Sequence, residues 1–121
     1  MDILHHYGRS EAIEDGVLVD VTESAKDAGI RYPTALTRAA WCRYVEVPEG
    51  LVGQDEAARL WDILWMLRCR ILASQPTHAV VTFKLYVQND LLPPKLVTLK
   101  AICGPGDDAA PTITIMLPDE D

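Results

Sequence analysis

The residue types that most often carry chemistry are present in this sequence, but their spacing fits no catalytic or metal-binding motif. The histidines His5, His6 and His78 have no serine or cysteine beside them in a recognisable nucleophile arrangement. The cysteines are odd in number, widely separated and set in apolar stretches: Cys42, Cys69 and Cys103. We therefore expect buried thiols, with no disulfide framework, no metal and no cofactor.

Two acidic features are further candidates for a chemical site. Asp20 is the best single candidate for acid–base work because it interrupts an apolar run, although an exposed strand residue explains it equally well. The Gly104–Asp108 segment has the glycines of an anion-binding loop and two carboxylates for a cation. Because it lies between two expected strands, a plain turn is the favoured interpretation.

Charge is unevenly distributed along the 121 residues, whose formal net charge is −7. Acidic residues dominate residues 1–62 and 107–121, and basic residues dominate 63–106. This balance opposes duplex nucleic acid and favours protein partners. The candidate partner-binding acids are Asp107, Asp108, Asp119, Glu120 and Asp121. A solvated acidic tail is the alternative.

Arg68 is a candidate partner-binding residue of a different kind. On a helix it would lie among Trp61, Trp65 and Leu72, where a guanidinium needs an acidic partner or access to water. An intramolecular role, with stacking on a tryptophan or an ion pair, is favoured over an anchor for a partner.

Three residues give an alternative site for nucleic acid. Lys84, Tyr86 and Lys100 would share the polar face of a sheet, a basic and aromatic mixture that single-stranded nucleic acids also use. An ordinary solvated sheet face that discourages edge pairing is the favoured interpretation.

The clearest predicted element is a long helix over residues 54–73. Its charged residues fall on one narrow stripe at 100° per residue: Asp55, Arg59, Asp62 and Arg70. The remaining positions are largely apolar, so we expect this helix to be buried on most of its circumference. Shorter helices are expected within residues 10–14, 22–29 and 34–45, with Thr34 or Thr37 as the cap of the third.

Period-two alternation predicts three strands near residues 79–88, 96–103 and 112–117, after a short extended segment at 17–21. Short connections favour an antiparallel meander with the long helix on its apolar face. The predicted fold is thus a single α+β domain, residues 1–121, with short N-terminal helices and one long apolar helix on a three-stranded antiparallel C-terminal sheet. No leader sequence or membrane span is recognisable, so we expect a cytoplasmic protein.

Three stretches together resemble a known family. They are residues 12–21 (AIEDGVLVDV), residues 60–65 (LWDILW), and residues 97–107 (VTLKAICGPGD) with 113–118 (ITIMLP). They resemble an uncharacterised bacterial domain of unknown function that is typically encoded on plasmids, phages and other mobile elements. The resemblance implies no catalytic residue. It implies a small accessory or counter-defence protein that binds host machinery.

The leading hypothesis is a non-enzymatic accessory factor that binds a host protein or complex, with stoichiometric inhibition of a host defence complex as one form of that role. The alternative is a nucleic-acid-binding module. An enzyme is the third hypothesis, and a pocket lined by Asp20, a histidine and Arg68 would be its first sign. A homodimer through the apolar helix is compatible with each.

Overall fold

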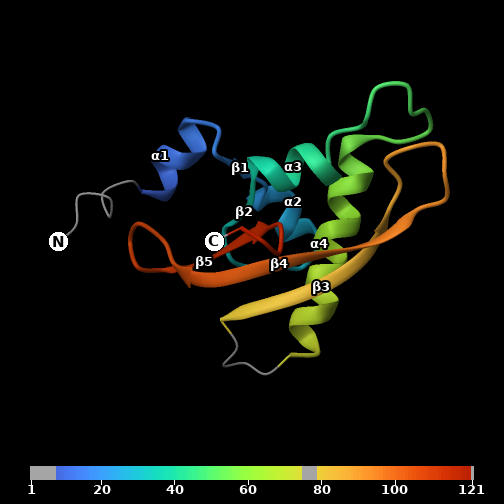
Figure 1. Cartoon of the computed structure of the whole chain (residues 1–121). Helices are drawn as coiled ribbons and strands as arrows, with labels where there is room; N and C mark the ends of the chain where they lie inside the picture. Colours follow the sequence, from blue (N-terminus) through green and yellow to red (C-terminus); the bar gives the residue numbers. More distant parts are fainter. Residues whose placement is uncertain (1–7, 75–78, 121) are drawn as a thin grey trace.

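A mixed five-stranded sheet forms the centre of the protein. The computed structural model describes residues 8–74 and 79–120, and Figure 1 shows the order of elements within them: α1 (Arg9–Glu14), β1 (Leu18–Asp20), α2 (Thr22–Asp27), β2 (Thr34–Thr37), α3 (Arg38–Tyr44), α4 (Glu56–Leu72), β3 (Val80–Val87), β4 (Lys95–Pro105) and β5 (Pro111–Met116). The strands lie in the order β1-β2-β5-β4-β3.

The sheet corrects the predicted fold. The α+β class is right, but the three-stranded antiparallel sheet is wrong, because β1 and β2 extend the sheet on the far side of β5. All neighbouring strands are antiparallel except β2 and β5, which run parallel, with residues 34–36 beside 113–115. This pairing joins segments far apart in the sequence, so local alternation does not reveal it.

Alternating side chains give the sheet an apolar face and a polar face. Phe83 pairs with Leu99, and Ala101 pairs with Ile115. All four are buried in the core. Thr82 pairs with Lys100 and carries its side chain to the opposite face. The predicted division of these residues between the two faces is therefore correct.

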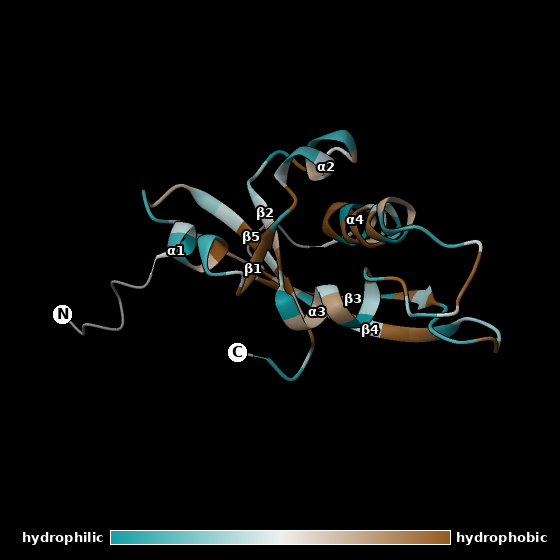
Figure 2. Ribbon diagram, turned by 90° about the horizontal axis from the view of Figure 1, so that it is seen from above, coloured by the Kyte–Doolittle hydropathy of each residue, from teal (hydrophilic) through white to brown (hydrophobic). Residues whose placement is uncertain are grey.

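Helices cover the two faces unequally. α2 and α4 lie beside each other on one side of the sheet (Figure 2), and Ala25, Ile63 and Leu67 are fully buried there. α1 lies apart from them, next to β1. Its Arg9 donates from Nη1 to Thr114 Oγ1 and from Nη2 to the Ile113 carbonyl, both at 2.7 Å. Because Thr114 alternates with the core residue Ile113, α1 covers the polar face.

The long helix α4 begins at an Asp55 cap, whose Oδ1 accepts from the Ala58 N–H at 2.8 Å. Its core-facing side chains are Leu60, Ile63, Leu64 and Leu67. The prediction that α4 is buried on most of its circumference is wrong, because Trp61, Trp65 and Leu72 are 41%, 42% and 70% exposed. A single sheet covers only one side of a helix. No described helix is both long and apolar enough to cross a membrane.

Arg59 corrects the predicted polar stripe, because it is only 6% exposed. Its Nε donates to the Val45 carbonyl at 3.1 Å, Nη1 donates to the Gln88 carbonyl at 2.6 Å, and Nη2 donates to Asn89 Oδ1. Burial lowers the pKa of the guanidinium, which stays protonated at neutral pH. Arg59 therefore joins α4 to the end of α3 and to the end of β3.

Candidate functional site

The exposed side of α4 carries a continuous aromatic and cationic surface, which we call the Trp-rich face: Trp61, Trp65, Arg68 and Leu72. These positions share one side of the helix at i, i+4, i+7 and i+11 spacing. The rings of Trp61 and Trp65 are stacked, with centroids 5.9 Å apart and an interplanar angle of 16°. The guanidinium carbon of Arg68 lies 5.0 Å from the centroid of the Trp65 ring.

Arg68 packs against two other residues. Its guanidinium carbon lies near the Trp65 ring. Its Nε lies close to the Gly29 backbone, where a Cβ would stand 2.6 Å from that nitrogen. Within residues 8–74 and 79–120, the guanidinium has neither a hydrogen bond nor an ion pair. The stacking predicted for Arg68 is thus present, and its positive charge has no carboxylate partner in the described part of the chain.

A cavity of about 420 Å³ opens beside the Trp-rich face. Its apolar walls come from α4, the segment after α2 and the apolar face of the sheet: Ile30, Ile71, Leu72, Val81, Ala101 and Ile113. Arg31, Tyr32, Arg68 and Cys103 add polar groups. The volume is within the range of about 300–1,000 Å³ that is usual for ligand sites. Because Arg68 and Leu72 belong to both features, the cavity and the Trp-rich face are continuous.

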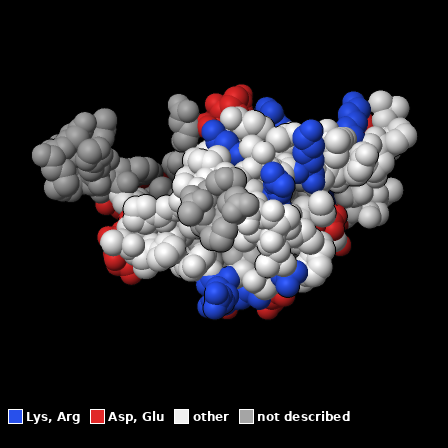
Figure 3. All heavy atoms as spheres, turned by 90° about the horizontal axis from the view of Figure 1, so that it is seen from below, with Lys and Arg blue, Asp and Glu red and all other residues white. Residues whose placement is uncertain are grey.

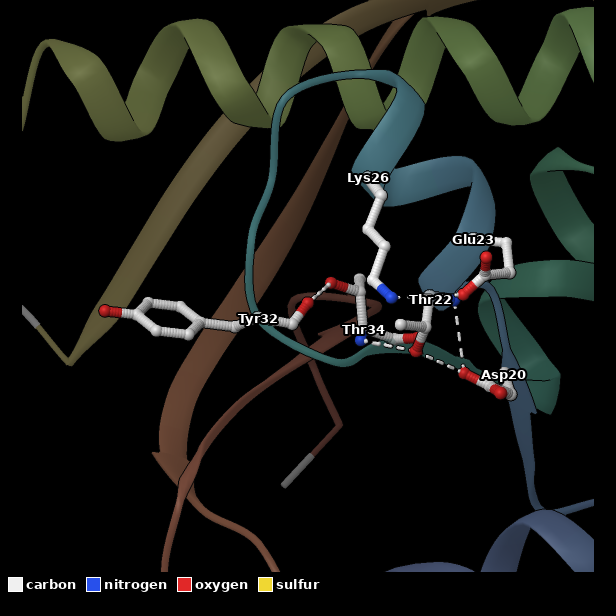
Figure 4. A network of polar contacts seen from close by, with 6 residues as sticks. All are labelled: Asp20, Thr22, Glu23, Lys26, Tyr32 and Thr34. Atoms are coloured by element: carbon white, nitrogen blue, oxygen red, sulfur yellow. Dashed lines mark hydrogen bonds and ion pairs between the residues drawn. The ribbon is translucent and has the colours of Figure 1, made fainter.

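The polar network around Asp20 has a structural role (Figure 4). Asp20 Oδ1 accepts from the Thr22 N–H at 3.1 Å and from Thr22 Oγ1 at 2.6 Å. Thr22 Oγ1 in turn accepts from the Thr34 N–H at 3.1 Å. These bonds attach the start of α2 to β1 and β2. Asp20 does not line the cavity beside Arg68, and the histidines proposed with it lie outside the described residues.

The prediction that the cysteine thiols are buried is correct only in part. Cys42 and Cys69 are exposed, so their predicted burial was wrong, and Cys103 is half-buried; all three are free. In the part of the chain that the structure describes, no three His, Cys, Asp or Glu side chains are grouped to hold a metal ion.

Asp107 fastens α1 to the β4–β5 turn. Its Oδ1 accepts from the Arg9 N–H at 2.7 Å, and its Oδ2 accepts from the Ser10 N–H at 3.1 Å. These backbone hydrogen bonds hold the pKa of the Asp107 carboxyl below its ordinary value. In the same turn, Asp108 Oδ1 accepts from the Ala110 N–H at 3.1 Å. The glycine-rich segment therefore forms the end of β4 at Gly104 and Pro105 and then the expected turn, and Asp107 has an intramolecular partner.

The second group of candidate acids lies beyond the other end of β5. Glu120 Oε2 accepts from Thr37 Oγ1 at 2.7 Å and from the Leu117 N–H at 2.8 Å. Asp119 is exposed, and Asp121 lies outside the described residues. Because β5 separates Asp119 and Glu120 from Asp107 and Asp108, these four described acids do not form one patch.

The three residues of the nucleic-acid hypothesis do share one sheet face. Lys84 and Tyr86 are two residues apart on β3, and Lys100 of β4 pairs with Thr82. The Tyr86 side chain is 68% exposed. In the view from below (Figure 3), basic side chains lie in an upper and a lower group, and acidic ones lie mainly along the rim.

Sequence reasoning named Arg68 but missed Trp61, Trp65 and Leu72 as surface residues. The signal was the width of the apolar arc around α4, which exceeds what one sheet can cover.

One known protein family matches the whole chain. The model of a family of unknown function, DUF6573, matches residues 1–121. Neither a curated protein nor a solved structure matches the chain.

Proposed function

Since the chain belongs to this family of unknown function, its role has to be inferred from its surface, and we propose that it is a non-enzymatic factor that binds a partner protein through the Trp-rich face. The observation that carries the proposal is the stack of Trp61 on Trp65 with the unpaired Arg68 beside it. Trp and Arg are the residue types most enriched among the side chains that dominate protein–protein binding energy.

The chemistry of the face indicates the chemistry of the partner. A protein surface that covers two tryptophans and a leucine must itself be apolar, and one that covers an unpaired guanidinium needs a carboxylate nearby. The acidic ends first considered as the contact region support binding less well, because Asp107 and Glu120 already accept intramolecular hydrogen bonds. The Trp-rich face therefore replaces them as the main contact in this proposal.

The wider role that we propose is an accessory factor of a bacterial mobile element, acting as a stoichiometric inhibitor of a host defence complex. Support comes from the resemblance of the sequence to small proteins encoded on plasmids and phages. Inhibition by contact also needs no catalytic residues, and none is recognisable in the sequence.

The test compares matched surface variants in a binding assay. Leu72→Glu and Arg68→Glu alter the Trp-rich face, whereas Leu91→Glu and Arg43→Glu make the same changes at exposed positions away from it. Tagged protein is cross-linked in host lysate, and the recovered species are then measured with purified components by light scattering. We expect a 1:1 complex with the unaltered chain and both controls, and its loss with both α4 variants. Recovery of the same species by all five proteins would refute the Trp-rich face as the binding surface.

A second candidate function is single-stranded nucleic-acid binding by the polar face of β3 and β4. It is favoured by the exposed Tyr86 beside Lys84 and Lys100. It is opposed by the net charge of −7. A gel shift at low salt that disappears with Lys84→Glu would support it, and absence of any shift would remove it.

A further inference from the structure

We infer that the cavity beside α4 accepts an apolar side chain of the partner protein, while a carboxylate of the same partner segment binds Arg68. This inference rests on the proposed function and names the feature that the partner must present. The ligand is thus a protein segment in which a leucine-, methionine- or phenylalanine-sized residue lies close to Asp or Glu.

The size and lining of the cavity fit one or two side chains. Its volume is about 420 Å³, and its floor is the apolar face of the sheet at Val81, Ala101 and Ile113. Ile30 and Ile71 also line it. An apolar side chain that enters such a cavity leaves water and gains close contacts, so the gain in affinity grows with the apolar area buried.

The charges at the cavity select an acidic segment. Arg31 and Arg68 both line it, and within residues 8–74 and 79–120 neither has an ion pair or a side-chain hydrogen bond. Arg68 also packs against the Trp65 ring and close to the Gly29 backbone, so less side-chain freedom is lost when it binds an anion than for a fully solvated arginine. A guanidinium held in this way can donate two hydrogen bonds to a carboxylate in a bidentate geometry.

Continuity with the Trp-rich face favours a protein segment over a small carboxylic acid. A small ligand that fills the cavity would contact Arg68 and Leu72 but would leave the Trp61 ring, which lies seven residues before Arg68 along α4, uncovered. A protein segment can place one side chain in the cavity and cover both tryptophans with its neighbours. The anchor residue would then lie in the cavity, and the carboxylate would lie between the anchor and the tryptophans.

The experiment uses dodecapeptides selected from a random displayed library against the full chain. Binding of synthetic copies is measured by the change in tryptophan fluorescence and by calorimetry. Cys103→Phe fills the cavity, and Arg68→Gln removes the positive charge. The matched controls are Cys42→Phe and Arg43→Gln, which make the same changes on α3 away from the cavity. Circular dichroism of each variant verifies that it is folded.

We expect the selected peptides to share an apolar residue within three positions of Asp or Glu. Cys103→Phe and Arg68→Gln should each raise the Kd at least tenfold, and both controls should leave it within twofold. Changing the peptide's Asp or Glu to its amide should weaken binding to the unaltered chain but not weaken binding to Arg68→Gln any further.

Three results would overturn the inference: no enriched peptide, enriched peptides without an acid, or a Kd unchanged by Arg68→Gln. Each can be told apart from failure of the proposed function, because loss of the partner with Leu72→Glu is measured on the whole complex. If Cys103→Phe does not fold, Arg68→Gln alone decides, since Arg68 is not part of the hydrophobic core.

Discussion

Replacement of Arg59 by methionine should be one of the most destabilising single changes in the chain. The guanidinium is buried, and its hydrogen-bond acceptors include the carbonyls of Val45 and Gln88 and the side chain of Asn89. Methionine replaces the aliphatic part of the arginine side chain but has no donor. The variant therefore leaves two backbone carbonyls without this donor, while the exposed Asn89 side chain can turn to water.

The magnitude follows from the two carbonyls. An unpaired buried acceptor costs about 1–3 kcal/mol, and part of that is regained because methionine avoids the desolvation of a charge. We expect a loss of about 3 kcal/mol and a fall in Tm of about 10 °C. Arg59→Lys should lose about 1–2 kcal/mol, because an ammonium retains the charge but cannot span all three acceptors.

Urea and thermal unfolding, followed by circular dichroism and tryptophan fluorescence, measure these changes. Arg43→Met is the matched control, because Arg43 is exposed, and its effect should stay within about 0.5 kcal/mol. A loss below about 0.5 kcal/mol for Arg59→Met would show that water satisfies the two carbonyls and would refute the reasoning. A large loss with Arg43→Met would refute it equally, since the effect would then not depend on burial.

Other predictions concern the ends of β5. Asp107→Ala should speed amide hydrogen exchange in α1 without changing exchange in α4. Equal α1 exchange in the variant and the unaltered chain would contradict the role of Asp107 in holding α1. Folding lowers the pKa of the Asp107 carboxyl, so its stabilisation of α1 is complete above about pH 4 and is lost as the pH falls through the lowered pKa. Amide exchange in α1 should therefore accelerate at that acidic pH. Glu120→Ala removes an acceptor of two hydrogen bonds and should lower the free energy of unfolding by about 1 kcal/mol in urea titrations; no change would mean that the contact adds nothing. Ala109 has a φ of 67°, so Ala109→Gly should raise Tm, by an amount equivalent to about 0.5–1 kcal/mol, and a lower Tm would argue against that backbone conformation.

Local sequence patterns predicted the elements that can be recognised from neighbouring residues, such as alternating strands and capped helices. Period-two alternation predicted strands near residues 79–88, 96–103 and 112–117, and β3, β4 and β5 lie there. Thr34 or Thr37 was predicted as the cap of α3, and Thr37 is the cap, since its Oγ1 accepts from the Ala40 N–H at 3.2 Å. Such signals depend on neighbours within a few residues, so a single sequence carries them.

Contacts between distant segments were not readable in the same way. Strand β2 has only four residues, too few to establish an alternation, and its parallel partner β5 begins 77 positions after β2 does. Arg59 was placed on a solvated stripe because charge usually indicates exposure, whereas carbonyls from α3 and β3 surround it. Asp107 is exposed, as expected of an acidic side chain, but its hydrogen bond from the Arg9 N–H could not be predicted, because Arg9 lies 98 positions earlier.

The place of β5 between β2 and β4 also bears on how the chain is synthesised. In the folded protein, β5 pairs with one edge of β2 and one edge of β4. Until residues 111–116 have left the ribosome, the N–H and C=O groups along these two edges have no strand to pair with. Residues Ala35 and Leu36, which end fully buried, stay accessible during that interval. Nascent copies emerging close together on one message would be able to pair through these open edges, so prompt insertion of β5 protects the newly made protein against aggregation.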